Sequence, residues 1–256
     1  MLLEVKDVSK EYSSGLLRSR TVRAVDHVSF TVREGEIVGL IGESGCGKST
    51  LTKLMLGLLK PSGGEIWYNE KTSLTQLSQR KWKPLRKEIQ CVFQHPQMTF
   101  NPQRNLYFSC AEPLRQFHIR PENGEKEFIR CMTERIGIPF DQLKKFPHEI
   151  SGGQAQRISI ARALSLQPRL LICDEATSML DVSVQAQILQ LLLKQNREHH
   201  TAMLFISHDL EVVEYMCSRV VVMKNGKVVE TGNTSEVFKN PQHEYTKKLL
   251  QAKIDL

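Results

Sequence analysis

The sequence lacks any apolar run that approaches the roughly 18–20 residues of a membrane-spanning helix. Its first residues, MLLEVKD, show no basic stretch followed by an apolar one, so we expect no signal peptide. Internal repeats and low-complexity tracts are also absent from the 256 residues. Hydrophobic residues make up 40% and charged residues 25% of the chain, which is ordinary for a globular protein. We therefore expect a cytosolic protein of one large or two small domains.

Cys-x-x-Cys pairs are missing too, which argues against a zinc site or a disulfide framework. The scattered thiols, predicted to be reduced and mostly buried, are Cys46, Cys91, Cys110, Cys131, Cys173 and Cys217. His199-His200 could touch a metal, but we interpret this pair as a solvated helix end. The net charge of +7 is compatible with nucleic acid, an anionic membrane surface or a nucleotide as partner. The densest basic segment, residues 80–87, is interpreted as a solvated helix start.

A phosphate-binding motif is the most informative feature that is present. Residues 42–49, GESGCGKS, match G-x-x-x-x-G-K-[ST] between an apolar run at 37–41 and a helix-like run at 50–59. Glycines let successive N–H groups turn toward phosphate oxygens, Lys48 can reach the β- and γ-phosphates, and Ser49 can hold Mg²⁺. The residues predicted to bind the nucleotide here are Gly42, Ser44, Gly45, Gly47, Lys48, Ser49 and Thr50. This motif predicts a nucleoside triphosphate site but not the use of its energy.

Hydrophobic periodicity predicts an α/β protein. Alternation at residues 3–8 and 28–32, with a short strand at 65–68, predicts a small antiparallel sheet within the first seventy residues. Two fully apolar runs, 170–173 and 203–206, are typical of a parallel sheet that is covered on both faces.

Helices and one hairpin complete this pattern. A helix at 184–198 would link the two apolar strands in a right-handed crossover. Residues 95–160 read as helical and are punctuated by prolines, whereas Asn225-Gly226 predicts a hairpin turn. The residues after Pro241 are expected to form an amphipathic helix.

An acidic pair follows the apolar strand at 170–173. Asp174 suits the Mg²⁺ shell, and Glu175 suits a base that orients and activates water. Ligands of parallel sheets bind at the carboxyl ends of the strands, where this pair is expected.

A second anion-binding segment decides the class. Residues 151–154, SGGQ, open a predicted helix at 155–166, and two cradles on one chain suggest that a second subunit closes each site. Here the sequence resembles the ATP-binding subunits of ABC transporters, in which this segment is the signature and two subunits enclose two ATP molecules. The residues assigned to this segment are Ser151, Gly152, Gly153 and Gln154.

The resemblance extends over nearly the whole chain, in the order of the family's motifs. Residues 42–50 resemble its Walker A, 92–94 its Q-loop, 170–175 its Walker B, 178–181 its D-loop and 207–209 its H-loop. It implies that Gln94 senses the metal and the attacking water, that His208 contacts the γ-phosphate, and that Asp181 works across the dimer interface. Tyr12, placed after the first strand, would stack on adenine. The implied cofactors are ATP and Mg²⁺, with Ser49, Gln94 and Asp174 near the metal.

Three positions depart from the family pattern. Cys173 replaces a larger apolar residue, Met179 replaces a small residue in the D-loop, and Ala155 follows the signature where a basic residue is common. No catalytic group is lost, so we expect hydrolysis.

The fold implied is a P-loop (RecA-like) parallel core with an N-terminal antiparallel β subdomain and an inserted α-helical subdomain. We expect one ABC ATPase domain in four parts: 1–93 (antiparallel strands and Walker A), 94–160 (helical subdomain), 161–240 (rest of the core) and 241–256 (helical tail).

The peptide and nickel importer branch is the nearest resemblance. Residues 93–96 with 101–102, then 146–149 and 243–246, are similar to motifs of that branch. The modest length favours nickel or a metal chelate as cargo, with a dipeptide or oligopeptide as the alternative.

The partners implied are a second ATP-binding subunit, two transmembrane permease subunits and, indirectly, an extracytoplasmic solute-binding protein. The expected place is the cytoplasmic face of the membrane, with no nucleic acid partner. A nucleic-acid-associated ATPase and a small-molecule kinase are weaker alternatives.

Overall fold

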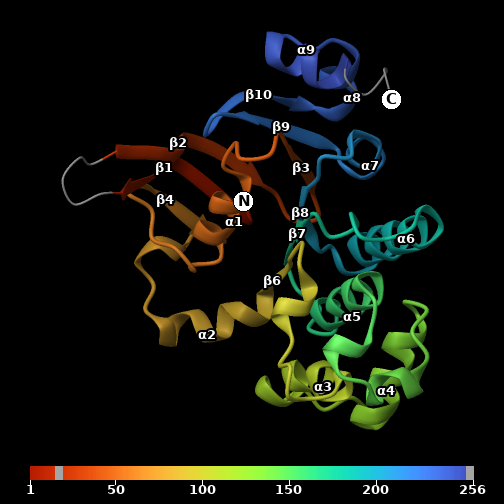
Figure 1. Cartoon of the computed structure of the whole chain (residues 1–256). Helices are drawn as coiled ribbons and strands as arrows, with labels where there is room; N and C mark the ends of the chain where they lie inside the picture. The colour runs from red at the N-terminus through yellow and green to blue at the C-terminus, as the bar shows by residue number, and fades with distance from the viewer. Residues whose placement is uncertain (15–19, 252–256) are drawn as a thin grey trace. The chain divides into compact units, whose positions relative to one another are not determined.

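Two units make up the part of the chain that the computed structural model describes, residues 1–14 and 20–251 (Figure 1). Unit 1 comprises Met1–Leu85 and Ala202–Leu256, and unit 2 comprises Arg86–Thr201. The division into four parts predicted from the sequence is a different one, and it stays a prediction. Within the described residues, no helix combines the length and the apolar character that crossing a bilayer requires.

An antiparallel sheet forms the N-terminal part of unit 1, as the alternating pattern predicts. Its strands run in the order β2-β1-β4-β5. They are β1 (Leu3–Ser14), β2 (Arg20–Val32), β4 (Gly63–Tyr68) and β5 (Thr72–Ser73), followed by the 3₁₀ turn η1 (Leu74–Gln76). Val5 pairs with Phe30 on one side and Ile66 on the other, and all three side chains are buried. The apolar face of this sheet therefore forms part of the hydrophobic core.

The second group of strands in unit 1 is mainly parallel. β3 (Ile37–Ile41) pairs in parallel with β8 (Ala202–Ile206) and with β9 (Arg219–Lys224). β10 (Lys227–Asn233) runs antiparallel to β9. Asn225 and Gly226 join them with φ of 49° and 81°, the left-handed conformation of a tight hairpin turn. The predicted hairpin is therefore confirmed.

Four short helices accompany these strands in unit 1. They are α1 (Lys48–Met55), α7 (Leu210–Met216), α8 (Thr234–Lys239) and α9 (Glu244–Gln251). α7 packs on β3, since a Cβ on Gly39 would lie 2.8 Å from Val213 Cγ1. The predicted helix after Pro241 is α9.

Unit 2 is dominated by helices, and α3, α4 and α5 gather together in Figure 1. Its two strands, β6 (Ile89–Val92) and β7 (Leu170–Asp174), pair in parallel. The helices are α3 (Leu106–Gln116), α4 (Gly124–Glu134), α5 (Gly152–Leu164) and α6 (Val182–His199). Three 3₁₀ turns connect them: η2 (Pro96–Thr99), η3 (Phe140–Lys144) and η4 (Pro147–Glu149).

The basic segment lies inside α2 (Gln79–Glu88), which leads from unit 1 into unit 2. Most of its charged side chains are exposed, but Trp82 is only 4% exposed. A Cβ on Gly57 would lie 2.4 Å from the Trp82 ring, so the indole covers that glycine. One face of this helix is therefore buried.

Several predicted bounds differ from the structure: β2 begins at Arg20 and not at Val28, α5 at Gly152 and not at Ala155, and α6 at Val182 and not at Val184. Two other differences have a local cause. Tyr12 lies within β1 and not after it, because the strand continues to Ser14 in register with β2. α1 begins at Lys48, two residues before the predicted start, because Gly47 already serves as its N-cap. His199 and His200 do end a helix, as predicted, and His200 has a φ of 51°.

The prediction that most of the thiols are buried is confirmed, since four of the six cysteines are buried. Cys46, Cys110, Cys173 and Cys217 are buried, whereas Cys131 is exposed.

Candidate functional site

The phosphate loop, Gly42 to Ser49, connects β3 to α1 in unit 1. Gly47 caps α1 with a φ of 110°, and a Cβ there would lie 2.3 Å from the Ala24 carbonyl oxygen. A Cβ on Gly42 would lie 2.2 Å from the Met223 carbonyl oxygen. Both positions therefore need glycine, because neighbouring backbone fills the space of a side chain.

Lys48 folds back over this loop. Its Nζ donates to the carbonyl oxygens of Gly42 at 2.6 Å and Glu43 at 2.9 Å, and lies 3.7 Å from Cys46 Sγ. The residue is only 8% exposed, so the ammonium is held by these acceptors and not by bulk water. The charge lies at the N-terminus of α1, where the helix dipole adds positive potential. This arrangement suits a polyphosphate.

Several of the other residues predicted to bind the nucleotide in this segment are less buried than Lys48. Ser44, Gly45 and Ser49 are exposed, and Thr50 is half-buried in the first turn of α1. Gly45 has a φ of 82°, and no atom lies within 4 Å of the place that a Cβ would occupy, so its role is conformational. The exposed Ser49 hydroxyl is a hard oxygen donor of the type that Mg²⁺ prefers.

Two other predicted residues belong to unit 1. His208 is exposed and follows β8 after Ser207, and the next residue, Asp209, caps α7 by accepting from the N–H groups of Glu211 and Val212. Tyr12 is 41% exposed on β1, and Lys10 Nζ lies 5.5 Å from the centre of its ring. An exposed ring of this kind is able to stack on a base.

Unit 2 brings Gln94 and Glu175 together. Gln94 Nε2 donates to Glu175 Oε2 at 2.5 Å, although the residues are 81 positions apart. Glu175 has a φ of 51°, an uncommon conformation for a residue with a long side chain. Ser178 holds it there, since its N–H and its hydroxyl both donate to the Glu175 carbonyl oxygen. Strained backbone of this kind clusters at functional sites.

Asp174 ends β7 and is 9% exposed. Two thiols, Cys91 and Cys173, lie near this carboxylate. Burial, together with the Asp174 charge, raises the pKa of Cys91 well above its ordinary value and raises that of Cys173 to about 12. Cys173 therefore packs as a small apolar side chain, and its departure from the family pattern leaves the carboxylate in place. Asp174 fits a hard cation such as Mg²⁺ by its donor type.

The signature segment, Ser151 to Gln154, opens α5 through reciprocal capping. Ser151 Oγ accepts from the Gln154 N–H at 3.2 Å, and Gln154 Oε1 accepts from the Ser151 N–H at 3.1 Å. Gln154 Nε2 also donates to Gln142 Oε1 at 2.9 Å, a partner that the sequence did not suggest. Ser151 is exposed, so no other part of the described chain covers the start of this helix.

The D-loop packs on the two glycines of this segment. A Cβ on Gly152 would lie 3.4 Å from Met179 Sδ, and one on Gly153 would lie 3.2 Å from the Met179 carbonyl oxygen. The two segments line one depression of about 430 Å³. Asp181 caps α6 at its rim, and the hydrogen bonds from the Val184 N–H and the Ser183 hydroxyl lower the pKa of Asp181. Met179, which replaces the small residue usual in the family, thus lies against the predicted signature segment.

The predicted residues therefore form two groups. Lys48, Ser49, His208 and Tyr12 belong to unit 1, whereas Gln94, Asp174, Glu175, Asp181 and the signature segment belong to unit 2. Their assembly into one ATP site stays a prediction. Tyr245 is not among the predicted residues, but its hydroxyl accepts from the N–H of Glu43, inside the phosphate loop, at 2.9 Å. Its signal in the sequence was present only as a branch motif at 243–246.

The family model described as ABC transporter matches residues 25–178. This chain belongs to the ABC transporter family. The match includes the phosphate loop, Gln94, the signature segment, Asp174 and Glu175. The ABC ATPase assignment made from the order of the motifs is thereby confirmed.

Named relatives support the same assignment. The chain is 43% identical over 235 residues to the oligopeptide transport ATP-binding protein OppF of Escherichia coli, covering 91% of this chain and 70% of that protein. It is 46% identical over 241 residues to the glutathione import ATP-binding protein GsiA of Salmonella paratyphi A, covering 93% of this chain. This ABC ATPase spans only 38% of the length of GsiA.

Solved structures confirm the fold of this ABC ATPase. The ATP-binding cassette MJ0796, in a dimeric post-hydrolysis state bound to ADP and Pi, aligns with a TM-score of 0.83 at 27% identity, covering 91% of this chain and 99% of that one. CbiO1 from Clostridium perfringens, part of the ABC transporter complex cbiONQ, aligns with a TM-score of 0.76 at 30% identity, covering 99% of this chain and 94% of that one. The predicted α/β fold, with a P-loop core, an antiparallel sheet and inserted helices, is confirmed.

Proposed function

We propose that this chain is the ATP-hydrolysing motor subunit of an ABC importer, with Mg²⁺ as its metal. The observation that carries the proposal is the Gln94–Glu175 hydrogen bond of 2.5 Å at the carboxyl end of β7. A carboxylate held by an amide supports the assignment of Glu175 as the group that orients and deprotonates water. A phosphate loop that already surrounds a lysine ammonium supplies the nucleotide end of the reaction.

Each group has a defined task in this proposal. Lys48 and the N–H groups of the phosphate loop bind the triphosphate, and Tyr12 stacks on adenine. Ser49 and Asp174 hold Mg²⁺, with Gln94 beside them, and the metal neutralises charge on the phosphates when bound. Glu175 orients and activates the attacking water.

The other proposed contacts come from a second ATP-binding subunit. Its signature segment and its residue corresponding to Asp181 would close the site, and His208 would contact the γ-phosphate. The exposure of Ser151 and Asp181 supports this arrangement, because both are available to another copy. We place the dimer at the cytoplasmic face of the membrane on two permease subunits, with an extracytoplasmic solute-binding protein delivering the cargo.

A peptide is the cargo that we propose. The expectation of nickel or a metal chelate rested on chain length, and the relatives do not support it. OppF is named for oligopeptide transport and GsiA for glutathione import, and glutathione is itself a tripeptide. The alternative reading from the sequence, a dipeptide or oligopeptide importer, is therefore the better one.

Phosphate release measured without any acceptor tests the motor. We expect release from ATP in the presence of Mg²⁺, none with excess EDTA, and none from a Lys48→Ala variant. Transfer of phosphate only to an added small molecule would instead support a kinase. Full turnover after removal of divalent ions would contradict the metal assignment.

Uptake in a strain that lacks this subunit tests the cargo separately. Labelled di- and oligopeptides should fail to enter, and the wild-type gene should restore entry whereas a Glu175→Gln gene should not. Loss of nickel uptake with normal peptide uptake would reverse the cargo assignment.

A further inference from the structure

The peptide group that joins Gly42 to Glu43 is held at both of its polar atoms. Its carbonyl oxygen accepts from Lys48 Nζ at 2.6 Å, and its N–H donates to the hydroxyl of Tyr245 at 2.9 Å. Tyr245 lies 202 positions away from Glu43, in α9. The first half of the phosphate loop is thus tied to the last helix of unit 1.

Tyr245 is itself fixed in place. Its side chain is 5% exposed, and Lys224 Nζ lies 4.7 Å from the centre of its ring. The segment before it is anchored by Glu230, whose carboxylate accepts from the N–H groups of Gln242 at 2.8 Å and His243 at 3.0 Å. The hydroxyl therefore has little freedom to leave the Glu43 N–H.

The hairpin that carries Glu230 also holds the second half of the loop. The Gly226 N–H donates to the Cys46 carbonyl oxygen at 2.9 Å, and the Asp26 N–H donates to the Gly226 carbonyl oxygen at 2.8 Å. Lys227 Nζ pairs with the Asp26 carboxylate at 3.1 Å.

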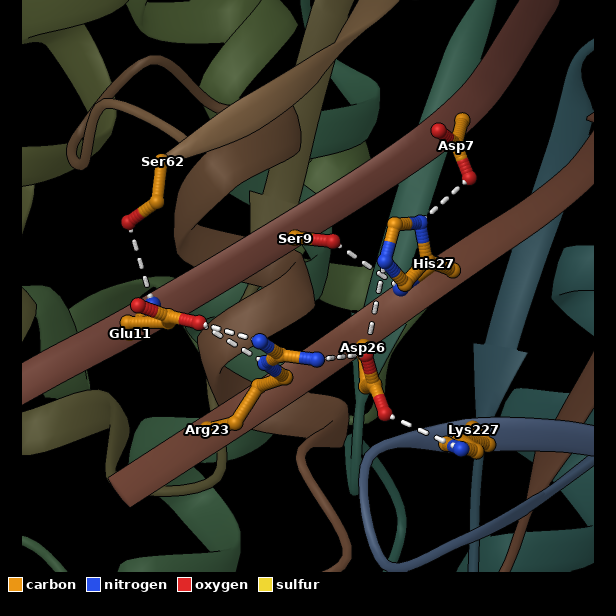
Figure 2. A network of polar contacts seen from close by, with 8 residues as sticks. All are labelled: Asp7, Ser9, Glu11, Arg23, Asp26, His27, Ser62 and Lys227. Atoms are coloured by element: carbon orange, nitrogen blue, oxygen red, sulfur yellow. Dashed lines mark hydrogen bonds and ion pairs between the residues drawn. The ribbon is translucent and has the colours of Figure 1, made fainter. Parts of the chain in front are cut away.

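Figure 2 shows how this contact continues into the antiparallel sheet: Asp26 also pairs with Arg23 at 2.9 Å, and Arg23 with Glu11 on β1. The hairpin turn is therefore braced from the sheet, and the phosphate loop is held from both of its ends without the help of Lys48.

The contacts that hold the phosphate loop without Lys48 become important when phosphate binds. An ammonium has three donors, and all three are directed at acceptors in the loop: two carbonyl oxygens and a thiol. Binding a phosphate oxygen requires Lys48 to give up at least one of them. If that one is the Gly42 oxygen, the peptide group keeps only the Tyr245 contact.

We propose that Tyr245 is a positioning residue for ATP binding, which keeps the Gly42–Glu43 peptide in its binding orientation while Lys48 moves to the phosphates. The proposal rests on the ATPase function proposed above. Tyr245 acts through the loop and touches neither nucleotide nor metal. A neutral hydrogen bond of this type corresponds to a roughly three- to tenfold change in affinity.

A Tyr245→Phe variant of the full chain tests this role, because it removes the hydroxyl and keeps the ring under Lys224. Titration with a fluorescent ATP analogue in Mg²⁺ should show a Kd raised roughly three- to tenfold, with KM raised in parallel. The thermal midpoint of the nucleotide-free protein should stay within about 2 °C of wild type. The matched control is Tyr215→Phe on α7, a side chain that is 59% exposed; it should change neither value.

A Glu230→Gln variant covers the case in which Tyr245→Phe fails to fold. It loosens the anchor of residues 242–243 and leaves the tyrosine intact, so a smaller rise in Kd would support the proposal. Unchanged Kd in both variants overturns it, as does a rise in Kd that merely follows a fall in the thermal midpoint. Absence of hydrolysis by the wild-type chain would instead remove the proposed function.

Discussion

Gln94 and Glu175 are joined by a hydrogen bond of 2.5 Å, and the backbone of Glu175 has a φ of 51°. The amide of Gln94 therefore restrains the carboxylate from outside its own strand, while Ser178 restrains the backbone. A base with a fixed direction loses little freedom when it engages water. Movement of the segment that carries Gln94 would release this restraint on the Glu175 carboxylate.

A Glu175→Gln substitution tests the proposal that Glu175 is the base, because it removes the acid–base group and nearly preserves the shape of the side chain. Glu175→Gln keeps an oxygen that accepts from Gln94 but removes the group that takes the proton, so turnover should fall by about two to four orders of magnitude. ATP affinity should stay near wild type, and size-exclusion chromatography with ATP and Mg²⁺ should show a trapped dimer. A variant with full turnover would falsify the assignment of Glu175.

Removing the amide tests the restraint itself. Gln94→Ala should lower kcat roughly tenfold or more, because a hydrogen bond to a charged group is worth about 1.5–3 kcal/mol, while KM for ATP changes less. Gln116→Ala, an exposed glutamine on α3, is the matched control and should behave as wild type. Equal losses in both variants would exclude a specific role for Gln94.

Met179 gives a prediction for the D-loop departure. Its sulfur lies against Gly152, so Met179→Ala should let the signature segment shift and lower kcat roughly tenfold, since small misplacements are costly in catalysis. Met179→Leu, of similar volume, should recover most of the rate. Binding of ATP to the separate subunit should be unaffected, and Met98→Ala, at a side chain 85% exposed, serves as control. Normal kcat in Met179→Ala would rule out this packing role.

The ion pair between Glu36 and Arg219 predicts a pH-dependent stability. Two contacts, at 2.8 and 3.1 Å, join side chains that are 11% and 24% exposed. Burial by itself would raise the pKa of Glu36, but the hydrogen bonds from Arg219 and from the Arg33 N–H outweigh it and lower the pKa below 4.5. The stabilisation is therefore fully present above pH 4.5 and is lost as the pH falls through the lowered pKa.

Glu36→Gln should accordingly reduce the free energy of unfolding by about 1.5–3 kcal/mol at pH 7, measured by urea unfolding. The difference from wild type should shrink when the pH drops below 4.5. Glu198→Gln breaks an exposed pair with Lys194 and should cost at most about 1 kcal/mol at either pH. A difference that grows in acid would contradict the expected direction of the pH dependence.

The parts of the fold that could be predicted are those that depend on short stretches of sequence. Apolar runs of four or five residues became the buried strands β3, β7 and β8, since only fully covered positions tolerate such runs. The Asn225-Gly226 turn was predictable because few residues accept its backbone angles. The continuation of β1 from Val8 to Ser14 was not, because it depends on pairing with β2 and not on alternation within β1.

The candidate site likewise has a part that the sequence predicts and a part that it does not. Gly42 to Ser49 was recognisable because backbone geometry around a phosphate demands glycines at set spacings, and the order of the motifs identified the family. The residues that contact these motifs in the folded chain could not be predicted from the sequence. Nothing near Glu43 in the sequence points to Tyr245, and nothing near Gly152 points to Met179, because both contacts join segments that meet only after the chain has folded.

The sequence by itself determined that this protein binds a nucleoside triphosphate and belongs among the ABC ATPases. Nucleotide binding depends on short segments, and the backbone conformation of each segment is set by its own residues. Tertiary structure alone decided what restrains those segments: the amide of Gln94 on Glu175, the D-loop on the signature glycines, and the last helix on the phosphate loop. Such restraints depend on distances of a few ångströms between residues far apart in the chain, and only the packed core sets those distances.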